Sequence, residues 1–509
     1  MTKRIFQQAR WNEKLLFELG SEGERGMLIP PFETEAGGRA ENSVPESMRR
    51  QNPPHLPEIS QVETLRHFLR LSQETLGAGL VADFGMATST VKYNPPVNEQ
   101  LARDARLAEL HPLQDERTVQ GLLEVMYRLE RFLQEISGLD RVSLQPRGGS
   151  QAIYANVSMV RAFHARRGET QRDEFITTIF SHPSDAAAPN VAGCKVITLY
   201  PEESGYPGLG ALKAVLSERT AGLIVTNPDD TGIFNPRIRE FTDLVHAAGG
   251  LCVYDQANAN GLLGVLRARE AGFDACQFNL HKTFSTPHAS GGPGAGASCV
   301  TEALAPFLPA PTVEFDGEKY YLDHDRPDSI GKIGSFYGVT ANFLRAYAWI
   351  MSMGADGLRE AANLAVLNNN YLLKKVLEIP GVTAPYQPNQ PRLDQVRYSW
   401  TELLQETGLK ITDISNRSAD LGMHFFFSHH PYVVSDPATL EPTESYSRRD
   451  IDTYVSSWAQ IADEARTQPE LVRSAPHNAP IHQMSDPTYL TDPEKWSPTW
   501  RAYRKKHSE

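Results

Sequence analysis

Asn279-Leu280-His281-Lys282-Thr283-Phe284-Ser285-Thr286-Pro287-His288 is the stretch that decides the fold, and Gly291-Gly292-Pro293-Gly294 follows it closely. A lysine in an uncharged setting beside a glycine-rich turn is typical of a chain that holds an aldehyde cofactor as a Schiff base. Lys282 must lose its proton to become nucleophilic, and burial together with nearby positive charge lowers the pKa of a lysine. We expect His281 to supply such charge, and the glycines to let the backbone approach a ligand.

A carboxylate stands upstream in the position that this chemistry requires. Gly250-Leu251-Cys252-Val253-Tyr254-Asp255 is an apolar run ending in an acid, which predicts a buried strand that delivers Asp255 at its C-terminal edge. Enzymes that use pyridoxal 5′-phosphate (PLP) need such an acid to keep the pyridine nitrogen protonated, so that the ring acts as an electron sink. An acid at a strand end, one more strand and then the lysine is the order expected of fold type I PLP enzymes. A Lys-Thr pair alone would indicate a surface turn.

Three segments together resemble one family. Tyr254-Asp255-x-Ala257-Asn258-x-Asn260, the stretch 279–288 and the glycine run 291–294 are similar to the P-protein of the glycine cleavage system, in particular the catalytic second subunit of two-subunit glycine decarboxylases. The resemblance covers roughly residues 55–480. It implies a fold type I (aspartate aminotransferase-like) α/β enzyme with PLP, a mostly parallel sheet in the large domain and a smaller α+β C-terminal domain.

Composition is consistent with a globular enzyme. The chain has 509 residues, a net charge of -12 and a pI near 5.7, which argues against nucleic acid as the main partner. No run approaches the roughly 18 apolar residues of a membrane span. Four cysteines are too sparse for a disulfide framework and lack metal-ligand spacing. We expect a cytoplasmic enzyme that binds neither nucleic acid nor membrane.

Periodicity predicts three regions. Residues 1–115 form an N-terminal arm and helices, 116–345 the large PLP-binding domain, and 346–509 the small C-terminal domain with a tail. Within the large domain, helices are predicted over 118–138 and 236–248, and strands over 175–180 and 222–228. Apolar strands that alternate with amphipathic helices indicate a mostly parallel sheet with function at the C-terminal edges of its strands.

The remaining cofactor contacts follow from strand ends and helix starts. Glycines and a serine before a predicted helix offer free N–H groups and a hydroxyl to an anion, so Gly149, Ser150 and Gln151 are assigned to the PLP phosphate. The resemblance places His182 over the cofactor ring. A lone histidine at a strand end is otherwise more often structural. The predicted cofactor-binding set is Gly149, Ser150, Gln151, His182, Thr226, Asp255, Ala257, His281 and Lys282, of which Lys282, His182 and Asp255 are the predicted catalytic residues.

The substrate side differs from the family. Tyr93, Asn94, Arg147 and His288 are candidate substrate residues. The family pattern is altered at residues 84–91, 147–152, 183–185, 256 and 289–290. A metal site at His429 and His430 near His424 is not expected, because no carboxylate stands in register with them.

Because the cofactor anchors are kept and the substrate-side segments are changed, the leading hypothesis is a repurposed relative. It would act on a larger amino acid, with S-adenosylmethionine as a candidate, through an external aldimine and a quinonoid carbanion, for elimination or replacement with C–C bond formation in specialised metabolism. The alternative is an authentic glycine decarboxylase (glycine dehydrogenase, aminomethyl-transferring) subunit 2, which would need a second subunit and a lipoyl carrier protein. A non-catalytic partner of an active paralogue is disfavoured, because Lys282 and Asp255 are intact. The arm suggests a homodimer.

Overall fold

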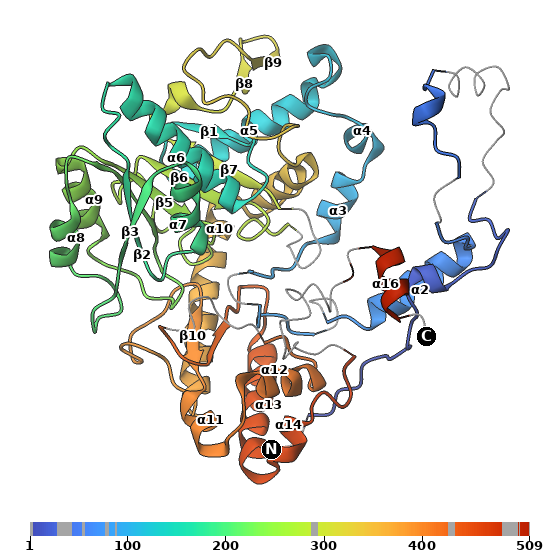
Figure 1. The fold of residues 1–509 in the computed structure, drawn as a ribbon. Helices are drawn as coiled ribbons and strands as arrows, with labels where there is room; N and C mark the ends of the chain where they lie inside the picture. The colour runs from blue at the N-terminus through green and yellow to red at the C-terminus, as the bar shows by residue number, and fades with distance from the viewer. Residues whose placement is uncertain are drawn as a thin grey trace.

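The computed structural model describes residues 4–27, 43–52, 56–76, 81–86, 89–286, 294–425, 433–480, 497 and 499–507. Within these ranges the chain forms a large domain built on one sheet, a smaller domain below it, and an arm that extends to one side (Figure 1). His288, His429 and His430 of the sequence predictions lie outside the described residues.

The large domain contains a seven-stranded sheet in the order β1-β7-β6-β5-β4-β2-β3. All neighbouring pairs from β3 to β6 are parallel, and β7 alone runs antiparallel to its neighbours β6 and β1. The predicted mostly parallel sheet is therefore confirmed. Its strands are β1 (Arg141–Ser143), β2 (Glu174–Thr178), β3 (Lys195–Leu199), β4 (Thr220–Thr226), β5 (Leu251–Gln256), β6 (Ala275–Asn279) and β7 (Gly296–Val300).

Helices cover both faces of this sheet because its strands are apolar on both sides. On β5, Cys252 and Tyr254 enter the hydrophobic core that contains α5 (Gln120–Ser137) and α9 (Ile238–Ala247), whereas Val253 enters the core under α6. Other elements of the region are α3 (Pro96–Ala102), α4 (Ala105–Ala108), α6 (Gly149–Arg166), α7 (Pro183–Val191), α8 (Leu209–Val215), β8 (Thr312–Phe315) and β9 (Tyr320–Asp323). The polar C-terminal ends of the parallel strands therefore meet at one edge.

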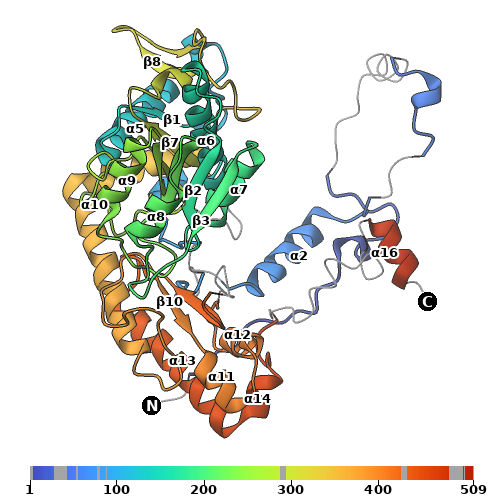
Figure 2. The same ribbon diagram turned by 60° about the vertical axis from the view of Figure 1, so that its left-hand side comes forward.

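A long helix, α10 (Thr340–Val376), joins the two domains (Figure 2). Its first part enters the large core through Phe343 and Trp349, and its last part enters the small core through Leu372. The helical geometry is interrupted at Gly354, where φ is 64°, a value that favours glycine. The predicted domain boundary at 345/346 falls inside this helix. No helix in the described part of the chain combines the length and apolar character needed to cross a bilayer.

The small domain is α+β, as expected. A two-stranded sheet of β10 (Val396–Ser399) and β11 (Pro437–Leu440) packs with four helices around Trp400 and Trp458. These helices are α11 (Thr401–Thr407), α12 (Ile411–Asp420), α13 (Arg448–Thr467) and α14 (Pro469–Arg473).

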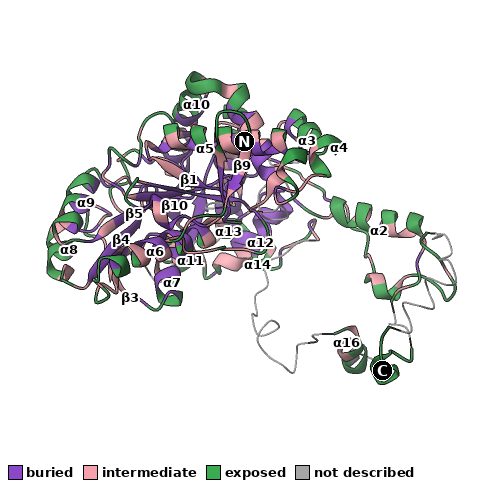
Figure 3. Ribbon diagram, turned by 90° about the horizontal axis from the view of Figure 1, so that it is seen from above, coloured by how far each residue is buried: buried purple, intermediate pink, exposed green. Residues whose placement is uncertain are grey.

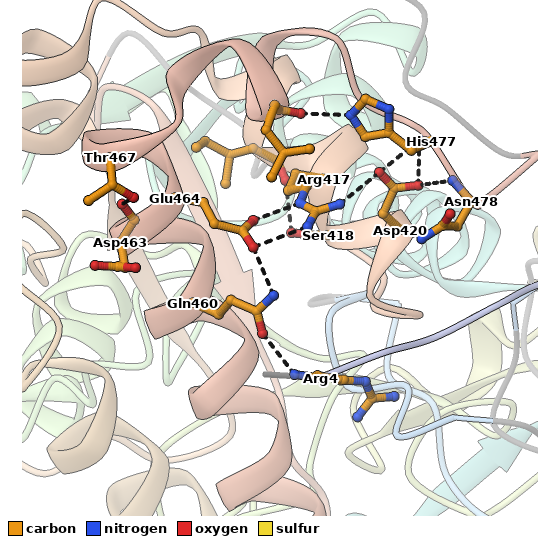
Figure 4. A network of polar contacts seen from close by, with 12 residues as sticks. Arg4, Arg417, Ser418, Asp420, Gln460, Asp463, Glu464, Thr467, His477 and Asn478 are labelled. Atoms are coloured by element: carbon orange, nitrogen blue, oxygen red, sulfur yellow. Dashed lines mark hydrogen bonds and ion pairs between the residues drawn. The ribbon is translucent and has the colours of Figure 1, made fainter. Parts of the chain in front are cut away.

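A buried charge network fixes α12 against α13 (Figure 4). The guanidinium of Arg417 donates to Glu464 Oε2 at 2.8 Å and Oε1 at 3.1 Å, and lies 3.2 Å from Asp420. Asp420 in turn accepts the backbone N–H groups of His477 and Asn478. Because buried charges are tolerated only when paired and hydrogen-bonded, each member of this network depends on the others.

We expect Glu464→Ala to lower the free energy of unfolding by about 3–5 kcal/mol, because it leaves the buried Arg417 with one carboxylate where it had two. Urea denaturation followed by fluorescence measures this loss. The matched control is Asp463→Ala on the neighbouring, exposed position of α13, which should change stability by less than about 0.5 kcal/mol. Equal effects of the two substitutions would contradict the stabilising role of the Arg417–Glu464 ion pair.

The N-terminal arm starts against the small domain, where the backbone N–H of Arg4 donates to Gln460 of α13 at 2.9 Å, and its helix α2 extends away from both domains (Figures 1 and 2). Helix α2 (Gln61–Gln73) buries only His67, which contacts Glu13, and most of its surface is exposed (Figure 3). Leu65 and Phe68 on this helix are 59% and 56% exposed. The C-terminal helix α16 (Trp500–His507) joins the arm, where Trp500 stacks on Phe17. A large apolar helix face exposed in this way indicates a contact surface for another chain.

Candidate functional site

A small cavity lies at the C-terminal ends of β4, β5 and the turn after β6. It brings together five residues that the sequence assigned to the cofactor: His182, Thr226, Asp255, Ala257 and Lys282. Its further lining residues are Pro228, Asp229, Asp230, Asn258, Asp394 and Gln395. Segments that are up to about 210 positions apart thus converge at the edge where a parallel sheet places its functional side chains.

Lys282 lies three residues after β6 and is 7% exposed. Burial lowers the pKa of its ammonium group, and the negative charges of Glu441, Asp255 and Asp230 oppose that shift. The lysine is therefore biased toward the neutral amine, which is the nucleophilic form.

The expected positive charge of His281 is wrong. Burial lowers the pKa of His281 to about 4, so the ring is neutral near pH 7. Its Nδ1 lies 2.9 Å from both the carbonyl oxygen and the backbone nitrogen of Ala295. His281 therefore ties the lysine turn to the start of β7, and burial, rather than its charge, depresses the pKa of Lys282.

This buried histidine predicts a pH dependence of stability. The pKa of His281 falls from 6.5 when unfolded to about 4 when folded, so the unfolded state binds the proton first as the pH falls. Stability from this group is complete above pH 6.5 and is lost between about pH 6.5 and 4, by roughly 3 kcal/mol in total. Urea denaturation at pH 7 and pH 4.5 should show a smaller acid-induced loss in His281→Asn than in the natural protein. A larger loss in the variant would contradict this account.

Asp255 is held at the end of β5 by donors on both sides. Its Oδ1 accepts the backbone N–H of Ala257 at 2.8 Å and the side-chain amide of Gln277 on β6. A second acid, Asp185 on α7, lies beside it, and burial together with the charge of Asp255 raises the pKa of Asp185 well above its usual range. Of these two carboxyl groups, Asp185 is the one whose neutral form is favoured by burial.

His182 is the N-cap residue of α7 and is oriented by the first turn of that helix. Its Nδ1 accepts the N–H of Ser184 at 3.1 Å and lies 2.7 Å from the Ser184 hydroxyl, while its backbone N–H donates to Thr226 Oγ1 at 3.2 Å. With Nδ1 as the acceptor, the proton of the neutral ring lies on Nε2. His182 and Thr226 are thereby fixed relative to each other at the cavity wall.

The start of α6 fits the phosphate of PLP. Gly148 caps this helix without a side-chain acceptor, and within the described residues the N–H groups of Gly149, Ser150 and Gln151 donate to no acceptor. A Cβ on Gly149 would lie 2.7 Å from Asn279 Oδ1, so only glycine allows the helix start to approach the end of β6. Free N–H groups at the N-terminus of an 18-residue helix make an anion site.

Tyr93, Asn94 and Arg147, three of the four predicted substrate residues, lie outside the described lining of the cavity. Tyr93 is 62% exposed, although its carbonyl oxygen accepts the hydroxyl of Ser285 in the lysine turn. Asn94 donates to Glu99, and the guanidinium of Arg147 lies over the ring of Phe336. Their roles in substrate binding stay predictions.

Three acidic residues of the cavity besides Asp255 were not predicted from the sequence. Asp229 and Asp230 follow the cis Asn227-Pro228 bond after β4, and Asp394 comes from the segment before β10. Burial raises the pKa of Asp229 and of Asp394 to about 7, and Asp230 pairs with the fully buried Arg397 at 2.9 Å. The polar residues that end the predicted strand 222–228 indicated a site next to Asp229 and Asp230, whereas no sequence pattern indicated Asp394.

One group of three potential metal ligands occurs in the described ranges, away from the cavity. Asp274 Oδ2 accepts His246 Nε2 at 2.8 Å and the backbone N–H of Cys252 at 2.7 Å. Hydrogen bonds account for this group, and it lies where β5 and β6 begin, at the edge of the sheet opposite to Lys282.

Comparison with known proteins gives the same relatives by sequence and by structure. Residues 361–482 match the family described as glycine dehydrogenase, C-terminal domain. The chain is 42% identical over 505 residues to a probable glycine dehydrogenase (decarboxylating) subunit 2 from Pyrococcus abyssi (strain GE5 / Orsay). It is equally similar, over the same length, to the protein of that description from Thermococcus onnurineus (strain NA1), and both alignments cover 98% of each chain.

A solved structure shares the fold. The crystal structure of glycine decarboxylase (P-protein) of the glycine cleavage system, in inhibitor-bound form, superposes with a TM-score of 0.72 at 20% sequence identity. The superposition covers 86% of this chain and 100% of that chain. The expected fold type I architecture is confirmed.

Proposed function

Because the chain belongs to the glycine dehydrogenase (decarboxylating) subunit 2 family, we propose that it is the cofactor-bearing subunit of a two-subunit glycine decarboxylase. The observation that carries this proposal is an identity of 42% over 98% of both chains. The chain is an enzyme, and its cofactor is PLP, as predicted. The substrate and the reaction are what we propose.

The residues of the cavity fit this cofactor. When bound, PLP supplies an electron sink for the electrons released as the carboxyl group leaves. Lys282 would bind its aldehyde, Asp255 its pyridine nitrogen and the N-terminus of α6 its phosphate. His182 would orient the ring from the wall of the cavity. Lys282, as a buried amine biased toward its neutral form, would also accept and return a proton at the reacting carbon.

The leading hypothesis from the sequence, a repurposed enzyme acting on a larger amino acid, finds no support in these relatives. The two relatives compared above over nearly their whole length are described as glycine dehydrogenase subunits. The alternative, glycine decarboxylase subunit 2, fits them better. The changed substrate-side segments therefore stand as variation within this family.

A subunit 2 implies a partner subunit. We propose the exposed face of α2 as part of the contact surface, because Leu65 and Phe68 lie on an arm that its own domains leave uncovered. The proposed assembly also contains a second copy of this chain, which forms a homodimer with the first, and a lipoyl carrier protein.

The test mixes the purified holoenzyme with subunit 1 and a lipoylated carrier protein, and follows the exchange of labelled bicarbonate into the carboxyl group of glycine. We expect exchange only in the complete mixture, and light scattering should show a complex of the two subunits. A complete mixture that exchanges nothing with glycine would overturn the proposal. A change of the holoenzyme spectrum with S-adenosylmethionine but not with glycine would return the function to the larger-substrate hypothesis.

A further inference from the structure

Glu441 of the small domain reaches the edge of the cofactor site. It directly follows β11, is 1% exposed, and anchors its backbone by donating its N–H to Phe84 O at 2.9 Å. Its carboxylate accepts the hydroxyl of Thr90 at 2.6 Å and the side-chain amide of Asn260 at 2.8 Å, and the amide of Asn258 donates to it as well. All three neighbours are donors to this carboxyl group, and their hydrogen bonds oppose the effect of burial, which favours its neutral form.

The bonded asparagines belong to the segment that follows Asp255. Asn258 lines the same cavity as Lys282, and the backbone N–H of Ala259 donates to Thr283 Oγ1 at 3.0 Å. The carboxylate of Glu441 is thus connected to the residue after Lys282 through one loop of three residues. Displacing Glu441 would release the donors that hold this loop.

Lys92 forms a second connection between the small domain and the lysine turn. Its buried ammonium donates to Thr283 O at 2.9 Å and to Asn260 Oδ1 at 3.1 Å, and pairs with Glu444 at 2.8 Å. It also lies 4.6 Å from the ring centroid of Trp349 on α10. Glu441 and Glu444, three residues apart, therefore hold the same loop and the same lysine turn from the small domain.

The negative charge of ionised Glu441 also acts on Lys282. Among the groups that favour the ammonium form of Lys282, Glu441 has the largest influence, ahead of Asp255 and Asp230. Burial raises the pKa of Glu441 to about 8, with Asp394 adding to the effect and the three donors opposing it. The other charged or titratable groups nearby are Lys92, Glu444, Tyr446 and the neutral His281.

We propose that Glu441 is a positioning residue through which the small domain holds the Asn258–Asn260 loop against the lysine turn and, in its ionised form, favours the protonated nitrogen of Lys282. The assignment rests on Lys282 as the cofactor-binding lysine and is independent of the identity of the substrate. It makes the acid–base behaviour of the site depend on the placement of the small domain.

The test is a pH titration of the absorbance band of the lysine-bound cofactor in holoenzyme of Glu441→Gln. Because the pKa of Glu441 is about 8, the group is only partly ionised near neutral pH. Its replacement removes that partial negative charge, which disfavours the protonated nitrogen, so the midpoint should move to lower pH by less than about one unit. Glu441→Asp, which keeps the charge, should recover most of the shift. The matched control Glu464→Gln removes another buried carboxylate of the small domain and should leave the midpoint unchanged.

Thr90→Val is the second variant of the test and is used if Glu441→Gln does not fold. It removes one donor to the carboxylate, which favours the neutral acid, and should shift the midpoint in the same direction by less. A wild-type midpoint in folded Glu441→Gln, or in Thr90→Val when that is the only folded variant, overturns the proposal. A natural holoenzyme with no such band would instead contradict Lys282 as the cofactor lysine, and the proposal with it.

Discussion

Lys282→Ala is expected to abolish the absorbance band of the lysine-bound cofactor and to reduce glycine-dependent exchange by about 10³-fold or more, because it removes both the covalent anchor and a proton-transfer group. Lys282 provides the only lysine amine in the described cavity lining, so no other lysine there can replace it. The ammonium of Lys92 is held by Glu444, Asn260 and the carbonyl of Thr283, which fixes it outside that lining.

Two further variants test whether the absorbance band depends on the covalent bond to Lys282 or only on positive charge at that position. Lys282→Arg keeps a positive charge but forms no stable imine at neutral pH, so the band should also disappear. Lys213→Ala, an exposed lysine on α8, should retain the natural spectrum. A band that persists in purified Lys282→Ala would show that the cofactor is bound elsewhere and would remove the basis for the site.

The core of the site could be predicted because local pattern and order along the chain determine it. An apolar run ending in Asp255 predicted β5, and the next strand before Lys282 is β6. Parallel strands place their C-terminal ends at one edge, so the acid and the lysine had to converge there. The predicted helix 118–138 and strand 222–228 correspond to α5 and β4 with small shifts at their ends.

The acidic surroundings could not be predicted in this way. Asp394 and Glu441 approach the lysine only because α10 brings the small domain against the large one, and no local pattern encodes that contact. His281 was assigned the wrong charge for the same reason, since its neutrality follows from burial, which depends on the whole fold. The prediction for Tyr93 relied on family resemblance and that for Arg147 on a departure from the family pattern, and the exposed side chains of both lie outside the described lining.

Asp255→Asn should reduce activity by about 10²–10⁴-fold, or roughly 3–5 kcal/mol of activation free energy, while the protein still folds and still shows the lysine-bound band, because a neutral amide would not keep the ring nitrogen of the bound cofactor protonated. An asparagine retains the size of Asp255 and can still accept the N–H of Ala257, but it cannot hold a proton on the pyridine nitrogen by opposite charge. The measurement is the glycine-dependent exchange rate at saturating glycine, together with the cofactor content.

Asp185→Asn is the matched control for this substitution. Burial and the neighbouring Asp255 raise the pKa of Asp185, so its replacement exchanges a neutral acid for a neutral amide and should cost much less activity than Asp255→Asn. If Asp185→Asn proved the more damaging of the two, the charge that serves the ring nitrogen would reside on Asp185, and α7 rather than β5 would carry the acid of the site. The two carboxyl groups differ in their hydrogen bonds. Asp255 accepts the backbone N–H of Ala257 and the amide of Gln277, whereas Asp185 accepts the hydroxyl of Thr226 at 3.3 Å and shares a hydrogen bond with Asp255. The two donors therefore fix the carboxyl group of Asp255 at the end of β5, while burial raises the pKa of Asp185 and favours its neutral form.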